Sequence, residues 1–113
     1  MHEMSLAMSV LQIVEDAARP YLPARVTCVR LEIGALAAVE PDALRFCFDA
    51  ATRGSLAEGA ALEIEQAPGR GLCLACAGEL ELGGMVEACP LCGEGPVQAI
   101  GGTQMRVRDF EIA

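Results

Sequence analysis

Four cysteines in two close pairs constrain the fold of this chain more than any other feature of its sequence. The pairs read C-L-A-C at residues 73–76 and C-P-L-C at residues 89–92, with twelve residues between them. Each C-x-x-C turn brings two thiolates onto one ion while backbone amides of the turn point at the sulfurs. Two such turns complete a tetrahedral shell of sulfurs. The spacing therefore predicts a structural metal site with the ligands Cys73, Cys76, Cys89 and Cys92.

Other chemistries use the same residue type, and the spacing helps to separate them. A redox C-x-x-C would be single and next to a βαβ pattern, whereas two occur here in a glycine-rich segment. Zinc and iron both suit a tetrahedral sulfur shell, so iron stays open beside zinc, the metal that we predict. A full shell leaves no position for water or substrate, which indicates a structural rather than a catalytic metal. Cys28 and Cys47 fall inside a predicted strand and a predicted helix, where we interpret them as small buried apolar residues.

The cysteines lie in a segment that cannot form an apolar core of its own. The composition changes at Pro68, and residues 69–102 are rich in glycine and cysteine but poor in large apolar side chains. We expect a bound metal to replace the missing core. Residues 69–102 are therefore predicted to form a separate lobe, inserted into the rest of the chain, residues 1–68 and 103–113.

The rest of the chain alternates helical and strand patterns. Apolar residues recur at helical spacing in residues 5–19 and 40–52, which predicts two amphipathic helices. Three segments are rich in β-branched residues and mostly alternating, which predicts strands at residues 25–34, 61–68 and 103–113. The predicted order is helix, strand, helix, strand, cysteine-rich insert and strand.

Composition excludes several classes of function. Sixteen acidic residues stand against eight basic ones, all arginine, for a net charge of −8. This leaves no cationic surface for phosphate backbones, so we expect no nucleic acid partner. No stretch is long and apolar enough to span a bilayer, and the N-terminal sequence does not resemble a signal peptide. We therefore expect no membrane association and a cytoplasmic location, where six cysteines favour metal binding over disulfides.

The single histidine of the chain is His2. Residues at chain ends are often solvated and mobile, and a disordered side chain is one interpretation of it. Its chemistry supports another: the α-amine of Met1, the backbone nitrogen of His2 and its imidazole Nδ1 can close fused five- and six-membered chelate rings. The amide nitrogen of Glu3, or its carboxylate, would supply a fourth ligand. Such a nitrogen-rich planar set suits Ni(II) or Cu(II).

With these features in view, the chain resembles the HypA/HybF family, the nickel-incorporation proteins of NiFe hydrogenase maturation. The resemblance covers nearly the whole length. It rests on the stretches MHEMSLAMSVLQIVE, VRLEIGALAAVEPDALRFCFD, LEIEQAP, CPLCG and GGTQMRVRDFEI. One departure is Ala77, which stands where a glycine is common after the second cysteine of the first pair. This departure leaves the ligands intact.

The resemblance implies a function, metals and partners. His2 would be the essential ligand of nickel, a transient cargo, with support from Glu3 and the backbone of Met1. The four cysteines would hold structural zinc. The implied partners are a HypB-like GTPase and the large subunit of a NiFe hydrogenase, and the sequence also allows a homodimer. The predicted function is that of a nickel metallochaperone.

The resemblance also implies a fold. The fold class is α+β, with two helices on a three-stranded, mostly antiparallel sheet and an inserted zinc-ribbon-like lobe. Residues 1–68 together with 103–113 would form the nickel-binding α/β lobe, and residues 69–102 the zinc-binding lobe. The order of elements read from the sequence agrees with this arrangement.

Two other functions compete with this prediction. A zinc-ribbon adaptor for protein or nucleic acid would present a basic and aromatic surface, whereas this chain is acidic and has one tyrosine and three phenylalanines. An enzyme would need acid–base groups, and the sequence offers one histidine, no evident nucleophile–base pair and a closed metal shell. We therefore predict no catalytic residues and no enzymatic activity.

Overall fold

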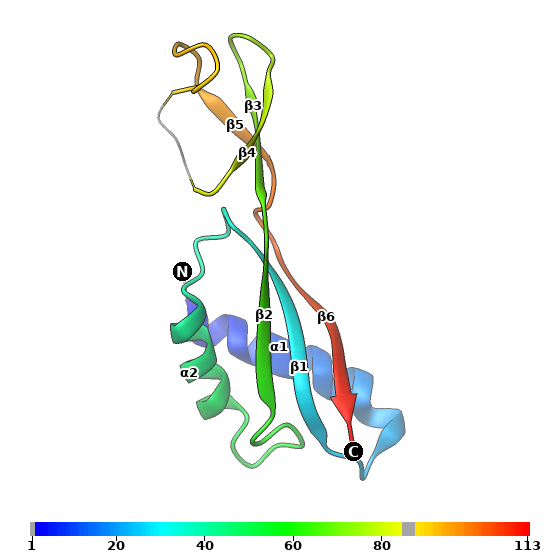
Figure 1. Ribbon diagram of the computed structural model, residues 1–113. Helices are drawn as coiled ribbons and strands as arrows, with labels where there is room; N and C mark the ends of the chain where they lie inside the picture. Colours follow the sequence, from blue (N-terminus) through cyan, green and yellow to red (C-terminus); the bar gives the residue numbers. More distant parts are fainter. Residues whose placement is uncertain (1, 85–87) are drawn as a thin grey trace. The chain divides into compact units, whose positions relative to one another are not determined.

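Two β-sheets and two α-helices are formed by residues 2–84 and 88–113, the part of the chain that the computed structural model describes (Figure 1). The helices are α1 (Glu3–Ala18), the short 3₁₀ helix η1 (Arg19–Tyr21) and α2 (Pro41–Ala51). The strands are β1 (Val26–Gly34), β2 (Ala61–Ala67), β3 (Gly69–Cys73), β4 (Glu79–Leu82), β5 (Val97–Gly101) and β6 (Met105–Ile112). The predicted α+β class is confirmed. Neither α1 nor α2 has the length and apolar composition that a membrane-spanning helix needs.

The chain divides into two compact units. The first comprises Met1–Glu32, Val39–Glu65 and Arg106–Ala113, and the second comprises Ile33–Ala38 and Gln66–Met105. The predicted lobes of residues 1–68 with 103–113 and of residues 69–102 stay a prediction, and residues 33–38 group with the second unit. The reason is backbone bonding: the Ala35 amide donates to the Ala67 carbonyl and the Leu36 amide donates to the Gly102 carbonyl, each at 2.8 Å. The assignment of one metal to each lobe stays a prediction.

The core of the first unit lies between the helices and one face of the sheet with the order β2-β1-β6 (Figure 1). Helix α1 buries a stripe of small and β-branched residues at helical spacing, namely Ala7, Val10, Val14 and Ala18. Helix α2 buries Leu44 and Phe48, and β1 buries Val29 and Leu31. Each large apolar side chain removed from water contributes about 1.5–3 kcal/mol to folding. These contacts hold both helices, and therefore the N-terminal end of α1, in place.

The three-stranded sheet is mixed rather than mostly antiparallel. The Val26 amide donates to the Leu56 carbonyl and the Ala35 amide to the Ala67 carbonyl, so β1 and β2 run in the same direction. At the other edge, Arg25 and Ala113 exchange both of their backbone hydrogen bonds, which makes β6 antiparallel to β1. The parallel pair follows from the chain path, because α2 carries the chain back across the sheet between β1 and β2.

The opposite face of this sheet carries arginines paired with carboxylates. The Arg30 guanidinium lies 3.1 Å from Glu63, 2.7 Å from Asp109 and 3.1 Å from Glu111, so one β1 side chain bridges to both neighbouring strands. Arg108 also pairs with Glu65. Such half-exposed pairs contribute less than about 1 kcal/mol each, so they favour the register rather than supply the main stability.

Glycines allow three segments of the second unit to cross at close range. A Cβ on Gly34 would lie 2.0 Å from the Gly102 carbonyl oxygen, and a Cβ on Gly102 would lie 2.5 Å from Gly69 Cα. Gly102 also has a φ of +76°, which favours glycine. Beyond this crossing, β3 pairs with β4 on one side and β5 on the other, both antiparallel.

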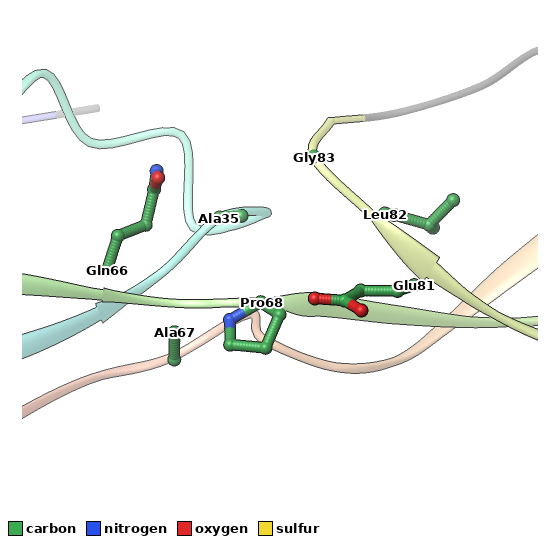
Figure 2. Close-up of a pocket in the computed structure, with 7 residues that line it drawn as sticks. All are labelled: Ala35, Gln66, Ala67, Pro68, Glu81, Leu82 and Gly83. Atoms are coloured by element: carbon green, nitrogen blue, oxygen red, sulfur yellow. The ribbon is translucent and has the colours of Figure 1, made fainter.

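The second unit also holds a pocket of about 540 Å³ beside the turn from β2 to β3 (Figure 2). Its lining residues are Ala35, Gln66, Ala67, Pro68, Glu81, Leu82 and Gly83. Figure 2 shows the Glu81 carboxylate pointing toward the ring of Pro68. Among these lining residues Glu81 alone is ionisable, and one carboxylate does not make a metal site.

Candidate metal centre

Two turns with the same backbone frame present the four cysteines of the second unit. The first follows β3 and the second precedes β5. In each turn, the amide four residues after the first cysteine donates to the carbonyl of that cysteine: Ala77 to Cys73 at 2.9 Å and Gly93 to Cys89 at 2.7 Å. The residue that follows the second cysteine has positive φ in both turns, 60° at Ala77 and 77° at Gly93. The two turns therefore have the same backbone geometry, although this position is an alanine in the first turn and a glycine in the second.

Backbone amides inside the turns point at the first sulfur of each pair. The amides of Ala75 and Cys76 lie 3.4 Å from Cys73 Sγ, and the amide of Leu91 lies 3.3 Å from Cys89 Sγ. Amides in this position stabilise negative charge on sulfur. The turns therefore direct backbone amide dipoles at the first sulfur of each pair, as metal-binding cysteine turns do.

The four sulfurs lie at the distances that a tetrahedral metal site requires. All four Sγ atoms lie within 4.8 Å of one another. Two of the separations are 3.7 Å, between Cys73 and Cys92, and 3.9 Å, between Cys76 and Cys89. A zinc–sulfur bond of about 2.3 Å gives a sulfur–sulfur separation of about 3.8 Å in a regular tetrahedron. The donor set and its spacing therefore fit zinc, and they bring together all four predicted cysteines.

The electrostatics of the cluster also favour a cation. Backbone amides of Glu94 and Gly95 lower the pKa of Cys92 to about 6. Cys76 differs: the Gly78 amide lowers its pKa, but the Cys73 thiol, burial and the other two sulfurs outweigh it and raise that pKa to about 11. The first negative charge therefore forms readily, and the later ones need a positive ion among the sulfurs.

A glycine that the sequence analysis did not single out makes room for the cluster. A Cβ on Gly95 would lie 2.7 Å from Cys73 Sγ and 2.5 Å from the Cβ of Ala75. No other residue fits there without displacing a ligand. The only signal in the sequence was the position of Gly95 three residues after Cys92, which does not by itself predict a close approach to the first turn.

The other predicted site residues lie at the start of α1. His2 is the N-cap residue of this helix and is exposed, and Glu3 is the first helical residue. Met1 lies outside the described residues. The Glu3 carboxylate oxygen Oε2 accepts a hydrogen bond of 3.3 Å from the Glu40 amide at the start of α2. This contact between residues 3 and 40 was not predicted from the sequence.

The two remaining cysteines belong to the first unit. Cys28 is buried on β1, and its thiol donates to the Glu63 carboxylate at 3.1 Å. Burial, followed by the hydrogen bond to Glu63 and its charge, raises the pKa of Cys28. Cys47, on α2, is half-buried. Burial is as predicted for Cys28 and only partial for Cys47.

Comparison with known proteins identifies the family. The family described as "Hydrogenase/urease nickel incorporation, metallochaperone, hypA" matches residues 1–112. The chain belongs to the HypA family.

Relatives of similar length support this assignment. The hydrogenase maturation factor HypA of Dechloromonas aromatica is 55% identical over 112 residues, which cover 99% of both chains. The corresponding factor of Albidiferax ferrireducens is 54% identical with the same coverage. The solution structure of the nickel metallochaperone HypA from Helicobacter pylori has a TM-score of 0.69 at 23% identity, covering 99% of this chain and 97% of that one. This last similarity shows a shared fold.

Membership of the HypA family gives the function at the level of the family. The protein is a nickel metallochaperone of hydrogenase maturation, a role without turnover. The four-cysteine cluster is consistent with a zinc site in such a protein. The resemblance stated from the sequence is thereby confirmed.

The pair of turns generates a prediction about backbone strain. Ala77→Gly should strengthen zinc binding about three- to fivefold, because glycine adopts positive φ without the steric cost of about 1 kcal/mol that alanine bears. Competition with a zinc chelator measures this change. Gly93→Ala is the mirror-image control and should weaken zinc binding. Weaker zinc binding in Ala77→Gly would show that the alanine methyl group has a packing role.

The Cys28–Glu63 contact generates a prediction about pH. The raised pKa of Cys28 keeps a larger share of this side chain as the neutral thiol in alkaline solution than an ordinary cysteine would have. Glu63→Gln removes a negative charge, so the pKa should fall and alkylation of Cys28 at pH 9 should become several-fold faster by mass spectrometry. Glu65→Gln, on the same strand face, is the control and should leave the rate unchanged.

The same shift has a consequence for stability. The thiol of the unfolded chain ionises at lower pH than the folded one, so this group stabilises the fold below about pH 8.5. That contribution is lost as the pH rises toward the raised value of the folded state. The alkylation experiment tests this assignment as well. If Cys28 reacted equally fast in Glu63→Gln and in wild type at pH 9, Glu63 would have no role in raising the pKa of Cys28.

Proposed function

We propose that the protein binds one nickel ion at its N-terminal end and passes it on, while Cys73, Cys76, Cys89 and Cys92 hold a structural zinc ion. The proposal rests on one observation above all: the predicted nickel ligands lie at a helix start where backbone amides have no helical partner. The first helical hydrogen bond of α1 runs from the Leu6 amide to the His2 carbonyl, at 3.1 Å. Within the described residues, the amides of Glu3 and Met4 therefore have no carbonyl four residues earlier with which to form a helical hydrogen bond.

Free amides make this helix start suitable for nickel. Ni(II) in a planar nitrogen set displaces protons from the backbone amides that it binds, so an amide already bonded in a helix would be a poor ligand. The amide of Glu3 can lose its proton without breaking a helical bond. The positive end of the helix dipole also favours the negative charge that remains on nitrogen. These arguments support the α-amine of Met1, the amide and imidazole Nδ1 of His2, and the amide of Glu3 as the ligand set.

The contact between Glu3 and Glu40 favours the amide of Glu3 over its carboxylate as the fourth ligand. The carboxylate already accepts the Glu40 amide at 3.3 Å. It thereby connects the start of α1 to the start of α2. In our proposal Glu3 positions the chain end through its side chain and binds nickel through its backbone.

The two metal sites would differ in access, and this difference suits their roles. Four thiolates enclose zinc and leave no free position, which suits a scaffold. His2 is exposed at the helix start, where another protein could approach it. An ion bound at an open chain end can be passed from ligand to ligand, whereas an ion in a closed shell is retained. We therefore assign nickel to the lobe of residues 1–68 and 103–113, and zinc to the lobe of residues 69–102.

We further propose that nickel passes from this protein, with a HypB-like GTPase, to the large subunit of a NiFe hydrogenase. The relatives of this protein are hydrogenase maturation factors, which supports a hydrogenase as the destination. The cytoplasm is the compartment that we propose for this transfer, since a thiolate cluster persists where thiols are kept reduced.

Substitutions at the helix start should separate the proposed nickel ligands. His2→Ala should lower nickel affinity by more than the roughly 10- to 100-fold that loss of an outer hydrogen-bond partner costs. Two residues added before Met1 should do the same, because they convert the amine into an amide. Isothermal titration with Ni(II) measures both effects.

Glu3→Gln is the matched control for this experiment. The glutamine oxygen can still accept the Glu40 amide, and the backbone nitrogen is unchanged, so nickel affinity should stay within a few-fold of wild type. A loss in Glu3→Gln as large as that in His2→Ala would contradict the backbone assignment and favour the carboxylate as ligand.

Loss of a cysteine should affect zinc and spare nickel. Structural zinc contributes about 10 kcal/mol or more to small domains of this kind, so Cys73→Ala should release zinc and disorder the second unit. Metal analysis together with circular dichroism should show near-zero zinc and retained helix. Cys47→Ala is the control and should keep one zinc per chain. Purified wild-type protein without zinc, but with an ordered second unit, would disprove the structural role.

A further inference from the structure

A groove is lined by α1 and α2 in the first unit, and none of its lining residues is a proposed metal ligand. It has a volume of about 270 Å³. Its lining residues are Met4, Met8, Leu11, Gln12 and Glu15 of α1 with Ala50 and Ala51 of α2. The two alanines leave space that a larger side chain would fill, so this side of the groove can admit a side chain of another molecule. Nothing in the proposed binding of nickel or zinc uses this surface.

The groove exposes a second apolar stripe on α1. Met4 and Met8 are 43% and 59% exposed, although α1 already buries a complete stripe against the core. The lining positions of α1, from Met4 to Glu15, share one helix face over three turns and extend for about 16 Å. Methionine is flexible and polarisable, and it is common on surfaces that accept partner helices. This stripe therefore has the length and character of a helix-binding face.

The charges of the two helices that line the groove favour a basic partner, and Glu15 is the ionisable residue of the lining itself. Residues 3–21 and 40–53 contain six acidic residues and three arginines, a net charge of −3. Each arginine pairs with an aspartate one turn away: Arg19 with Asp16, Arg45 with Asp42 and Arg53 with Asp49. Within the described part of the chain, the carboxylates of these segments that have no cation partner are Glu3, Glu15 and Glu40.

We propose that this groove binds an amphipathic helix of a partner protein, one with large apolar residues at positions i, i+4, i+7 and i+11 and basic residues beside them. The apolar residues would cover Met4, Met8 and Leu11, and a basic residue would meet Glu15 at the far end. A second copy of this acidic chain fits poorly, because the carboxylates of two grooves would repel each other. An anionic lipid surface is disfavoured for the same reason.

The position of the groove gives this docking a role in nickel transfer, and this consequence rests on the proposed function. Met4 lines one end of the groove and lies two residues from His2. A helix bound along α1 would therefore have one end within about one turn of the proposed nickel ligands. The partner that the groove selects would be a donor or an acceptor of nickel.

A designed peptide tests the groove directly. The probe is a fluorescently labelled 16-residue helix with leucine at the four stated positions and arginine beside them. Anisotropy should show binding to the full-length protein in the micromolar range, without added nickel. The same peptide with glutamate in place of arginine should bind at least tenfold more weakly, as should a shuffled sequence of the same composition.

Two substitutions of equal charge localise the binding. Met8→Glu places a carboxylate in the groove and should weaken binding of the basic probe at least tenfold. Ile13→Glu is the control, because Ile13 is 51% exposed on α1 and does not line the groove. Its added charge is the same, and probe binding should be unchanged. Both positions are exposed, and circular dichroism checks that both variants are folded.

Three outcomes of these experiments would overturn the proposal. Equal binding of the shuffled or the acidic peptide would show nonspecific association, and equal effects of Met8→Glu and Ile13→Glu would place the site elsewhere. A concentration-dependent dimer that Met8→Glu abolishes would identify a second copy as the occupant. Nickel titration of Met8→Glu separates the two proposals: unchanged nickel affinity with lost peptide binding supports the groove, whereas failure of His2→Ala to lower nickel affinity would refute only the nickel site.

Discussion

Four thiolates within 4.8 Å of one another repel strongly unless a cation lies among them, and the second unit is organised around this requirement. Its strands are short, and its largest buried side chains include the sulfur ligands Cys73 and Cys89 themselves. Amides of the two turns point at the sulfurs, and Gly95 leaves the space that Cys73 needs. A metal bound by these sulfurs would supplement the few large apolar side chains that this unit buries, such as Ile33 and Leu82. A coordination shell would in this way hold a glycine-rich segment together.

The two units illustrate two ways of placing a metal ligand. In the second, two regular turns present all four sulfur donors, and a bound ion would complete and hold the site. In the first, the proposed donors are a chain end and amides that the helix leaves unbonded, and the fold contributes mainly an anchor. That anchor is the buried stripe of α1 together with the hydrogen bond from the Glu40 amide to the Glu3 carboxylate. The cysteine turns of the second unit suit retention of a metal, and the open chain end of the first unit suits its release.

Local sequence patterns predicted the two α-helices, the strands of the sheet β2-β1-β6 and the cysteine turns. They could not predict the contacts between residues that lie far apart in the sequence. The cysteine spacing determines which sulfurs meet, because each turn is local and only one shell satisfies all four donors. The parallel pairing of β1 with β2 was not predicted, since it depends on the path of the chain through α2. The bond between Glu3 and Glu40 joins residues 37 apart and leaves no periodic signal. The close approach of Gly95 to Cys73 likewise appears only once both turns are built.

Burial divides the four cysteine sulfurs unequally. In each turn the first cysteine, Cys73 or Cys89, is buried, and the second, Cys76 or Cys92, is exposed. A metal held by this cluster is therefore shielded on one side and reachable on the other. Oxidants and competing thiols would meet Cys76 and Cys92 first, so exchange of the ion would begin at those two bonds and proceed stepwise. A site that is thermodynamically tight can in this way remain open to kinetic exchange, with a defined direction of attack.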